Sequence, residues 1–319
     1  MSKYFLGIAG LLVGFAGTAW AQSGDRLFPI VELTDADLAQ IDLTDGSAED
    51  WRQVVGEPTL TALDFRTDPD YADYDPSDMD FRIWLAWHRA SNRIYVAMER
   101  SDDIYLSEYS GRNCADRTCS MGWQDSYLTF SVDGDHSGGQ VLLSPEESQI
   151  DQEERLLFLY QQAQRYHAIA EVHGTDSHVE LLGTLSPVDW FAMPPYAEGG
   201  GGAIKGNPAI SVTEFYVTPF DYFIHNDEEE SVVSELSPGK IIGFAISVTD
   251  VDTEDHRQES IHYLRAVEPD WTCLGVCSVV IYDSDDYSLG LLMGSGGTSP
   301  AVSAVESNTW ARIKASFGK

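Results

Sequence analysis

Apolar and polar residues alternate along several short segments of the chain, the pattern of strands with one buried face. In the segment 81–88, odd positions fall on one face of a strand and even positions on the other. The alternation predicts strands at 81–87, 93–99, 127–132, 166–172, 178–182, 211–217, 240–248, 278–282 and 309–317. Residues 174–177, Gly-Thr-Asp-Ser, favour a hairpin turn between two of these strands.

A helical pattern interrupts these strands. Ser144, Pro145 and the two glutamates that follow suit a helix start, and the run 153–165 has helix formers with an apolar stripe. Residues 36–40 suit a further short helix. Stretches rich in Asp, Pro or Gly indicate surface loops at 68–80, 194–206 and 294–300. We therefore predict one mainly β domain over 22–319, an antiparallel β-sandwich of jelly-roll-like form with one inserted helix.

Residues 1–21 have the order of a secretory signal. Lys3 precedes an apolar run, and Ala19-Trp20-Ala21 places small residues at the two positions that a signal peptidase reads. The apolar run has about 15 residues, short of the roughly 20 that a membrane-spanning helix needs. We expect cleavage after Ala21, export to the periplasm or the extracellular space, and no membrane span in the mature protein.

The chain has four cysteines, Cys114, Cys119, Cys273 and Cys277. An even number of cysteines in an exported protein indicates two disulfides, and three pairings are open. The close spacings favour the pairs 114–119 and 273–277. The competing interpretation is a four-cysteine zinc site, which both spacings also allow.

The formal net charge of −33 limits the choice of partners. Nucleic acids and anionic membrane surfaces need Lys and Arg, so this acidic chain is not expected to bind either. The charge fits neutral ligands, cations, or a salty habitat in which self-repulsion is screened.

Five motifs, taken together, carry a family resemblance. They are the segments 41–51 (I-D-L-T-D-G-S-A-E-D-W), 84–103, 125–139, 238–252 and 309–317. In this order they resemble family 9 carbohydrate-binding modules and their DOMON-like relatives. The resemblance implies a β-sandwich that binds a saccharide, although other members of the fold class bind haem and fold does not fix function. The stretch 144–206 departs from the compact family pattern and is predicted to be an insertion.

Side chains that suit a saccharide gather on one face of the first two long strands. Sugars present apolar C–H faces to flat rings and hydroxyls to polar groups. The candidate ligand-binding residues are Arg82, Trp84, His88, Tyr95 and Glu99 on the strands and Tyr109, Arg112 and Trp123 in a nearby loop. The competing interpretation assigns the tryptophans to the core.

The segment 133–139, D-G-D-H-S-G-G, resembles the first half of a calcium loop. Asp133, Asp135 and Ser137 offer oxygen ligands at alternate positions before two glycines. The twelfth position is Ser144 instead of Glu, which excludes an EF-hand. Asp250 and Asp252 form a second candidate, and Asp102 and Asp103 a third. The competing interpretation is a plain acidic turn.

The sequence contains no catalytic signature such as G-x-S-x-G, H-E-x-x-H or a glycine-rich phosphate loop. We therefore expect a non-catalytic, exported carbohydrate-binding protein that calcium stabilises, with no prediction of its oligomeric state. The alternatives are a haem-binding redox module of the DOMON type, with Met98 as an axial ligand, a structural surface or assembly protein, and a glycosidase that uses two of the many carboxylates.

Overall fold

The structure is a computed structural model that describes residues 27–68, 71–106, 127–138, 161–170, 180–183, 190–204, 206–225, 227–252, 259–264, 284 and 287–295. Its strands are β1 (Leu27–Leu33), β2 (Leu60–Thr61), β3 (Arg66–Thr67), β4 (Met79–His88), β5 (Arg93–Asp102), β6 (Tyr127–Asp133), β7 (Gln164–Ile169), β8 (Glu180–Gly183), β9 (Ala197–Ile204), β10 (Ala209–Val217), β11 (Phe220–Tyr222), β12 (Val232–Val233), β13 (Ile241–Asp250), β14 (Ser260–Leu264) and β15 (Ser288–Leu292). The helical elements are α1 (Asp35–Leu38), α2 (Glu49–Val54), and the 3-10 turns η2 (Ala62–Asp64) and η5 (Trp190–Ala192). The predicted mainly β class is confirmed.

Period-two alternation located five of the long strands, although it missed β1 and β9. The strands predicted at 81–87, 93–99, 127–132, 211–217 and 240–248 correspond to β4, β5, β6, β10 and β13. The strands predicted at 166–172 and 178–182 correspond to β7 and β8, which pair antiparallel. The strands predicted at 278–282 and 309–317 lie outside the described residues.

Strand β1 connects two halves of one hydrogen-bonded sheet. The strand order is β8-β7-β6-β13-β15-β1-β4-β5-β10-β9, with β2 beside β4 and with β14 between β13 and β3. The first half of β1 pairs in parallel with β15, and its second half, Val31–Leu33, pairs in parallel with β4. We call β8, β7, β6, β13, β14 and β15 the β13 half-sheet, and β2, β4, β5, β10 and β9 the β5 half-sheet.

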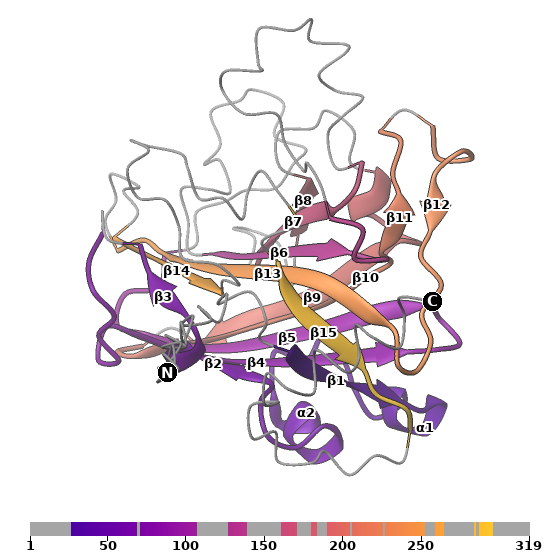
Figure 1. The fold of residues 1–319 in the computed structure, drawn as a ribbon. Coiled ribbons are helices and arrows are strands. Elements are labelled where there is room, and N and C mark those ends of the chain that lie inside the picture. The colour runs from indigo at the N-terminus through magenta and orange to yellow at the C-terminus, as the bar shows by residue number, and fades with distance from the viewer. Residues whose placement is uncertain are drawn as a thin grey trace, which may run out of the picture.

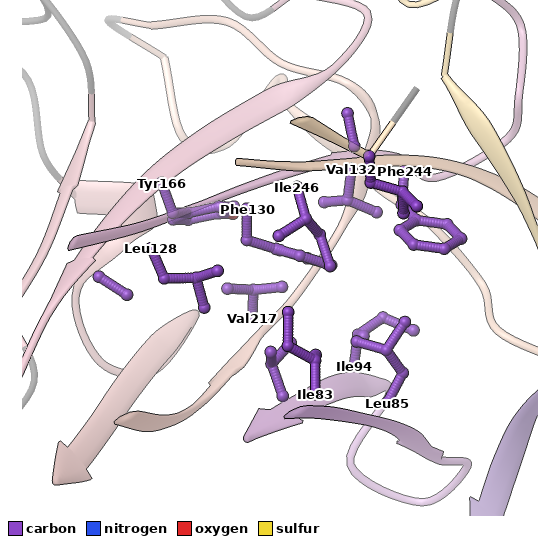
Figure 2. Close-up of a cluster of buried hydrophobic side chains, with 14 of the residues drawn as sticks. Ile83, Leu85, Ile94, Leu128, Phe130, Val132, Tyr166, Val217, Phe244 and Ile246 are labelled. Carbon is purple, nitrogen blue, oxygen red and sulfur yellow. The ribbon is translucent and has the colours of Figure 1, made fainter. Parts of the chain in front are cut away.

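The two half-sheets enclose one apolar core (Figures 1 and 2). Figure 2 shows Ile83, Leu85 and Ile94 of the β5 half-sheet opposite Phe244 and Ile246 of the β13 half-sheet, all of them buried. Burying one such side chain stabilises the fold by about 1.5–3 kcal/mol relative to leaving it in water. The predicted inward face of the segment 81–87 is therefore confirmed.

A second apolar cluster lies on the outer face of the β5 half-sheet. Figure 1 shows α1 and α2 on the outer side of β1 and β4. Trp51 of α2 packs there, fully buried, with Trp84, Tyr95, Val212 and neighbouring residues of β4, β5 and β10. Helix α2 was not predicted from the sequence, and it covers part of the outer face of the β5 half-sheet.

The segment predicted as a loop at 194–206 contains strand β9, so that prediction is wrong for residues 197–204. Its four consecutive glycines pair with β10 while the segment 42–46 lies against them. A Cβ atom on Gly200 would lie 2.1 Å from the carbonyl oxygen of Leu43 and 2.8 Å from the Cα of Thr44. Glycine is therefore required here because a side chain would keep the backbone of the segment 42–46 away from β9.

Several predictions concern residues outside the described ranges. These are the signal segment 1–21, the four cysteines and most of the predicted helix 144–165. The end of that helix prediction is wrong, because Gln164 and Arg165 begin strand β7. The predicted insertion 144–206 contributes β7, β8 and β9, and the last two end the strand order on opposite sides. Among the helices of the described residues, none combines the length and apolar composition that crossing a membrane requires.

We predict that Gly200→Ala destabilises the protein by about 1–3 kcal/mol or more, because the added methyl group meets backbone atoms that cannot move independently. Gly294→Ala is the control, since its Cβ atom would meet Pro238 at an ordinary 3.6 Å. Urea unfolding monitored by tryptophan fluorescence measures both variants. Equal stability of the two variants would contradict the packing of the segment 42–46 on β9.

Candidate functional site

The predicted saccharide face of β4 and β5 is sealed. Strand pairing places Arg82 opposite Glu99 and Ala86 opposite Tyr95, so the predicted side chains do share one face. However, Trp84 and Tyr95 are 0% and 2% exposed beneath Trp51 and its neighbours. The expectation that these rings are open to a sugar is therefore wrong, and the competing interpretation of Trp84 as a packed residue is correct.

Polar groups of this face form hydrogen bonds with other residues of the protein. Trp84 Nε1 donates to the carbonyl of Gly56 at 2.9 Å. His88, 6% exposed, contacts the carboxylate of Asp35 at 3.0 Å and the hydroxyl of Ser91 at 2.9 Å. His88 thus ties α1 to the end of β4 and is not available to a ligand.

At the edge of the same face, Arg82 remains half-exposed and forms an ion pair with Glu99 at 3.3 Å. Glu99 also forms an ion pair with Arg52 of α2. Arg82 and Glu99 therefore belong to a charged rim around α2. The other three predicted ligand-binding residues, Tyr109, Arg112 and Trp123, lie outside the described residues.

The outer face of the β13 half-sheet carries a small hollow of about 10 Å³, room for about one water molecule. Strand pairing places Arg165 of β7 beside Ser131 of β6, and Tyr263 of β14 beside Ser247 of β13. Small side chains form the floor between Arg165 and the Tyr263 ring because Thr129, Ser131, Ala245 and Ser247 occupy the central strands. We call these six residues the outer-face hollow.

Arg165 is the charged residue of this hollow, and no ion pair among the described residues involves it. Beside it, His167 contacts the hydroxyl of Thr129 at 3.1 Å. Burial, together with the charge of Arg165, holds the pKa of His167 well below its usual value, so the ring is neutral. The hollow thus offers one fixed positive charge, hydroxyls that donate and accept, and one aromatic wall.

The acidic turn after β6 is held together by its own backbone. The carboxylate of Asp133 accepts hydrogen bonds from the amides of Ser137 at 3.3 Å and Gly138 at 2.9 Å. Asp135 also accepts from the amide of Ser137, at 3.1 Å. Among the residues that the structure describes, the acidic side chains grouped closely enough for one ion do not include these two. The bonds are those of a plain acidic turn.

The second predicted calcium pair, Asp250 and Asp252, lies in a larger acidic group. Ligand atoms of Asp102, Asp250 and Asp252 lie within 4.8 Å of one another, as do those of Asp78, Asp252 and Glu259. The group forms where β5 and β13 end and where β4 and β14 begin. We call these five residues the strand-end acidic site.

Arg100 partly neutralises this site from inside the core. Its guanidinium, fully buried, forms ion pairs with Asp102 and Asp250 and donates to the carbonyl of Thr249 at 2.7 Å. Asp250 itself is fully buried, yet within the described part of the chain its Oδ2 atom has no hydrogen-bond partner. Arg100 thus forms ion pairs with two of the five carboxylates of this site.

Burial and the neighbouring negative charges raise the pKa values of carboxyl groups in the strand-end acidic site. Burial raises the pKa of Asp250 to about 6 against the opposing charge of Arg100. Burial, followed by the charges of Asp250 and its neighbours, raises the pKa of Asp252 to about 8 and that of Asp78 to about 6. The site must hold protons or a cation near neutral pH.

The remaining candidate, Met98, lies in the apolar core at 2% exposure. Sequence reasoning also missed the residues of the outer-face hollow and two members of the strand-end site, Asp78 and Glu259. The sequence could have indicated the floor of the hollow, because Thr129 and Ser131 alternate with the apolar residues Leu128 and Phe130. No periodicity signals Asp78 or Glu259, which precede strands.

Comparison with known proteins gives a likeness of fold. A family 9 carbohydrate-binding module from Caldicellulosiruptor kristjanssonii in complex with glucose has 10% identity and a TM-score of 0.49, covering 86% of this chain and 100% of that one. A module of the same family and organism in complex with cellotriose has 11% identity and a TM-score of 0.47, covering 88% and 99%. No family model matches the sequence, and no curated protein matches it.

We predict that, in calcium-free buffer, the free energy of unfolding decreases as the pH rises from about 4 to about 8. Between these values Asp252 keeps its proton in the folded state, whereas an unfolded Asp with a pKa near 3.9 has released it, so a rising pH favours unfolding. Asp252→Asn should reduce this slope. Urea titrations at a series of pH values measure it.

The control for this slope is Glu57→Gln, which removes an exposed carboxylate outside the acidic group. It should leave the slope unchanged. If Asp252→Asn and Glu57→Gln gave the same slope, general charge repulsion would be sufficient to explain the pH dependence.

Proposed function

We propose that this protein is an exported, non-catalytic carbohydrate-binding protein built as a β-sandwich, with its ligand site in the outer-face hollow and calcium as a structural cofactor. The single observation that carries the ligand assignment is the hollow itself. It joins a guanidinium that forms no ion pair with any described residue, three hydroxyl side chains and an aromatic wall on paired strands.

The composition of the hollow suits part of a saccharide. Sugar hydroxyls donate and accept, which matches Thr129, Ser131 and Ser247, while the planar guanidinium of Arg165 donates two parallel hydrogen bonds to neighbouring oxygens. The ring of Tyr263 offers a face to sugar C–H groups. Because the walls stand close together, with Arg165 8% exposed and Tyr263 7% exposed, we expect only a hydroxyl or exocyclic group of the sugar to enter.

The position of the hollow on paired strands is a further reason to place the ligand site there and not on the β4–β5 face predicted from the sequence. The floor residues belong to β6 and β13, which pair over seven residues in the centre of the half-sheet. A site on paired strands is already organised before binding, so little conformational entropy is lost.

Calcium is assigned to the strand-end acidic site. Hard carboxylate oxygens are the ligands that calcium prefers, and Asp252 belongs to both overlapping groups of ligand atoms. A bound ion would supply the partner that Asp250 Oδ2 lacks and would hold the ends of β5 and β13 together. An exported protein meets calcium at concentrations that suit such a site.

We predict that Arg165→Ala weakens saccharide binding about tenfold or more, the cost of losing hydrogen bonds to a charged group. A glycan array of neutral and acidic saccharides, read with calcium present, identifies the ligand, and calorimetry then compares the variants. Arg165→Lys should recover little, because the ammonium keeps the charge but lacks the planar pair of donors.

The matched control is Arg82→Ala, which removes an arginine from the predicted face that α2 covers. It should leave affinity unchanged. Loss of binding in Arg82→Ala with full binding in Arg165→Ala would move the ligand site back to the β4–β5 edge. An array without any bound glycan would end the carbohydrate proposal.

We also predict that calcium stabilises the protein and that Asp252→Asn removes most of this effect at the strand-end site. Calcium at about 100 times its dissociation constant should add about 2.7 kcal/mol to the free energy of unfolding. Thermal unfolding with calcium or with a chelator measures the difference. Equal gains in wild type and Asp252→Asn would place the stabilising ion elsewhere.

A further inference from the structure

Three carboxylates converge on the outer face of the β5 half-sheet, away from both sites described above. They belong to Asp45 in the segment before α2, Asp50 in the first turn of α2 and Glu214 in the middle of β10. One oxygen of each lies within 4.8 Å of the other two. We call these three residues the loop acidic site.

Glu214 is the buried member of this site. Its strand partners are Ala97 on β5 and Gly200 on β9, and its side chain lies on the face that holds Val212 and Tyr216. The residue is 0% exposed, and one carboxylate oxygen accepts from Trp51 Nε1 at 2.7 Å. The other oxygen, Oε2, has no hydrogen-bond partner among the residues that the structure describes. An unpartnered carboxylate oxygen at this depth costs free energy unless something binds it.

The segment before α2 holds the other two carboxylates in place. Asp45 accepts from the amide of Ser47 at 2.7 Å, and Asp50 accepts from the amides of Asp42 at 2.9 Å and Trp51 at 2.7 Å. Each of these carboxylates keeps lone pairs for a further partner. The segment also rests on β9, where Gly200 allows close approach, so the arrangement exists before any ligand arrives.

No basic side chain neutralises the loop acidic site among the described residues. The nearest arginine along the chain, Arg52, forms ion pairs with Glu49 and Glu99. Burial and the negative charges of Asp50, Asp45 and Asp42 raise the pKa of Glu214 to about 9, with the Trp51 hydrogen bond opposing. Two outcomes satisfy Glu214: a retained proton or a bound cation.

We propose that the loop acidic site binds one calcium ion, with Asp45, Asp50 and Glu214 as its carboxylate ligands. Three hard oxygens match calcium, and two ligands on opposite sides of the ion lie about 4.8 Å apart when each bond is about 2.4 Å. Water at the exposed Asp45 completes the coordination. The ion replaces the missing partner of Glu214 and neutralises the converging charges.

This ion would fasten the segment 42–50 and α2 to the sheet. Trp51 packs on Trp84 and Tyr95 in the same cluster, so the ion also stabilises the cover over the predicted aromatic face. The proposal does not depend on saccharide binding, and it concerns a site on the opposite half-sheet from the outer-face hollow.

The test uses the whole mature protein, stripped of metal and titrated with calcium in a calorimeter. Asp45→Asn should weaken the binding of one ion about tenfold or more, because an exposed ligand is lost without disturbing the core. Glu214→Gln should abolish that event, and its amide oxygen can still accept from Trp51. Terbium gives a second readout, since an ion at this site lies beside Trp51 and its emission should be sensitised by tryptophan excitation.

Asp75→Asn is the matched control, because Asp75 accepts from the amide two residues ahead at 2.8 Å, as Asp45 does, but belongs to no acidic group among the described residues. It should bind calcium as wild type does. Asp252→Asn should remove a different binding event and leave the tryptophan-sensitised terbium emission. Unchanged calcium affinity in Asp45→Asn would overturn the proposal and leave Glu214 as a buried, protonated acid.

Discussion

The packing of two half-sheets across one apolar core is the constraint on which the rest of the molecule depends. Alternation along β4, β5, β6 and β13 commits every second side chain to that core, so the remaining side chains must form two outer faces (Figure 2). Strand β1, which pairs with both halves, fixes their connection. The chemistry available to a ligand is then decided by what covers each outer face.

The two outer faces are buried with side chains of different size. On the β5 half-sheet, α2 buries Trp51 against Trp84 and leaves only a charged rim. On the β13 half-sheet, small residues keep a hollow between Arg165 and Tyr263. The difference follows from side-chain volume: large rings attract an apolar cover, whereas serine and threonine offer little apolar area to bury.

The chain has 52 acidic and 19 basic residues, so most of its carboxylates have no basic partner. Arg100 compensates Asp102 and Asp250 where β5 and β13 end, while Glu214 lies beneath α2 beside an indole N–H donor. Both places combine deep burial with clustered carboxylates. In both, a buried carboxylate oxygen has no hydrogen-bond partner among the described residues. Both calcium proposals rest on this combination, because one divalent ion neutralises several carboxylates at once.

The sequence by itself determined the mainly β class, the positions of the long strands and the inward face of β4, because a period of two is a local property of the chain. It also located Asp250 and Asp252, which are close in sequence. Only the tertiary structure decided that α2 seals Trp84, that four glycines form a strand, and that Asp45 and Asp50 meet Glu214. These outcomes depend on contacts between segments far apart in the chain, and short-range patterns of hydrophobicity carry no information about such contacts.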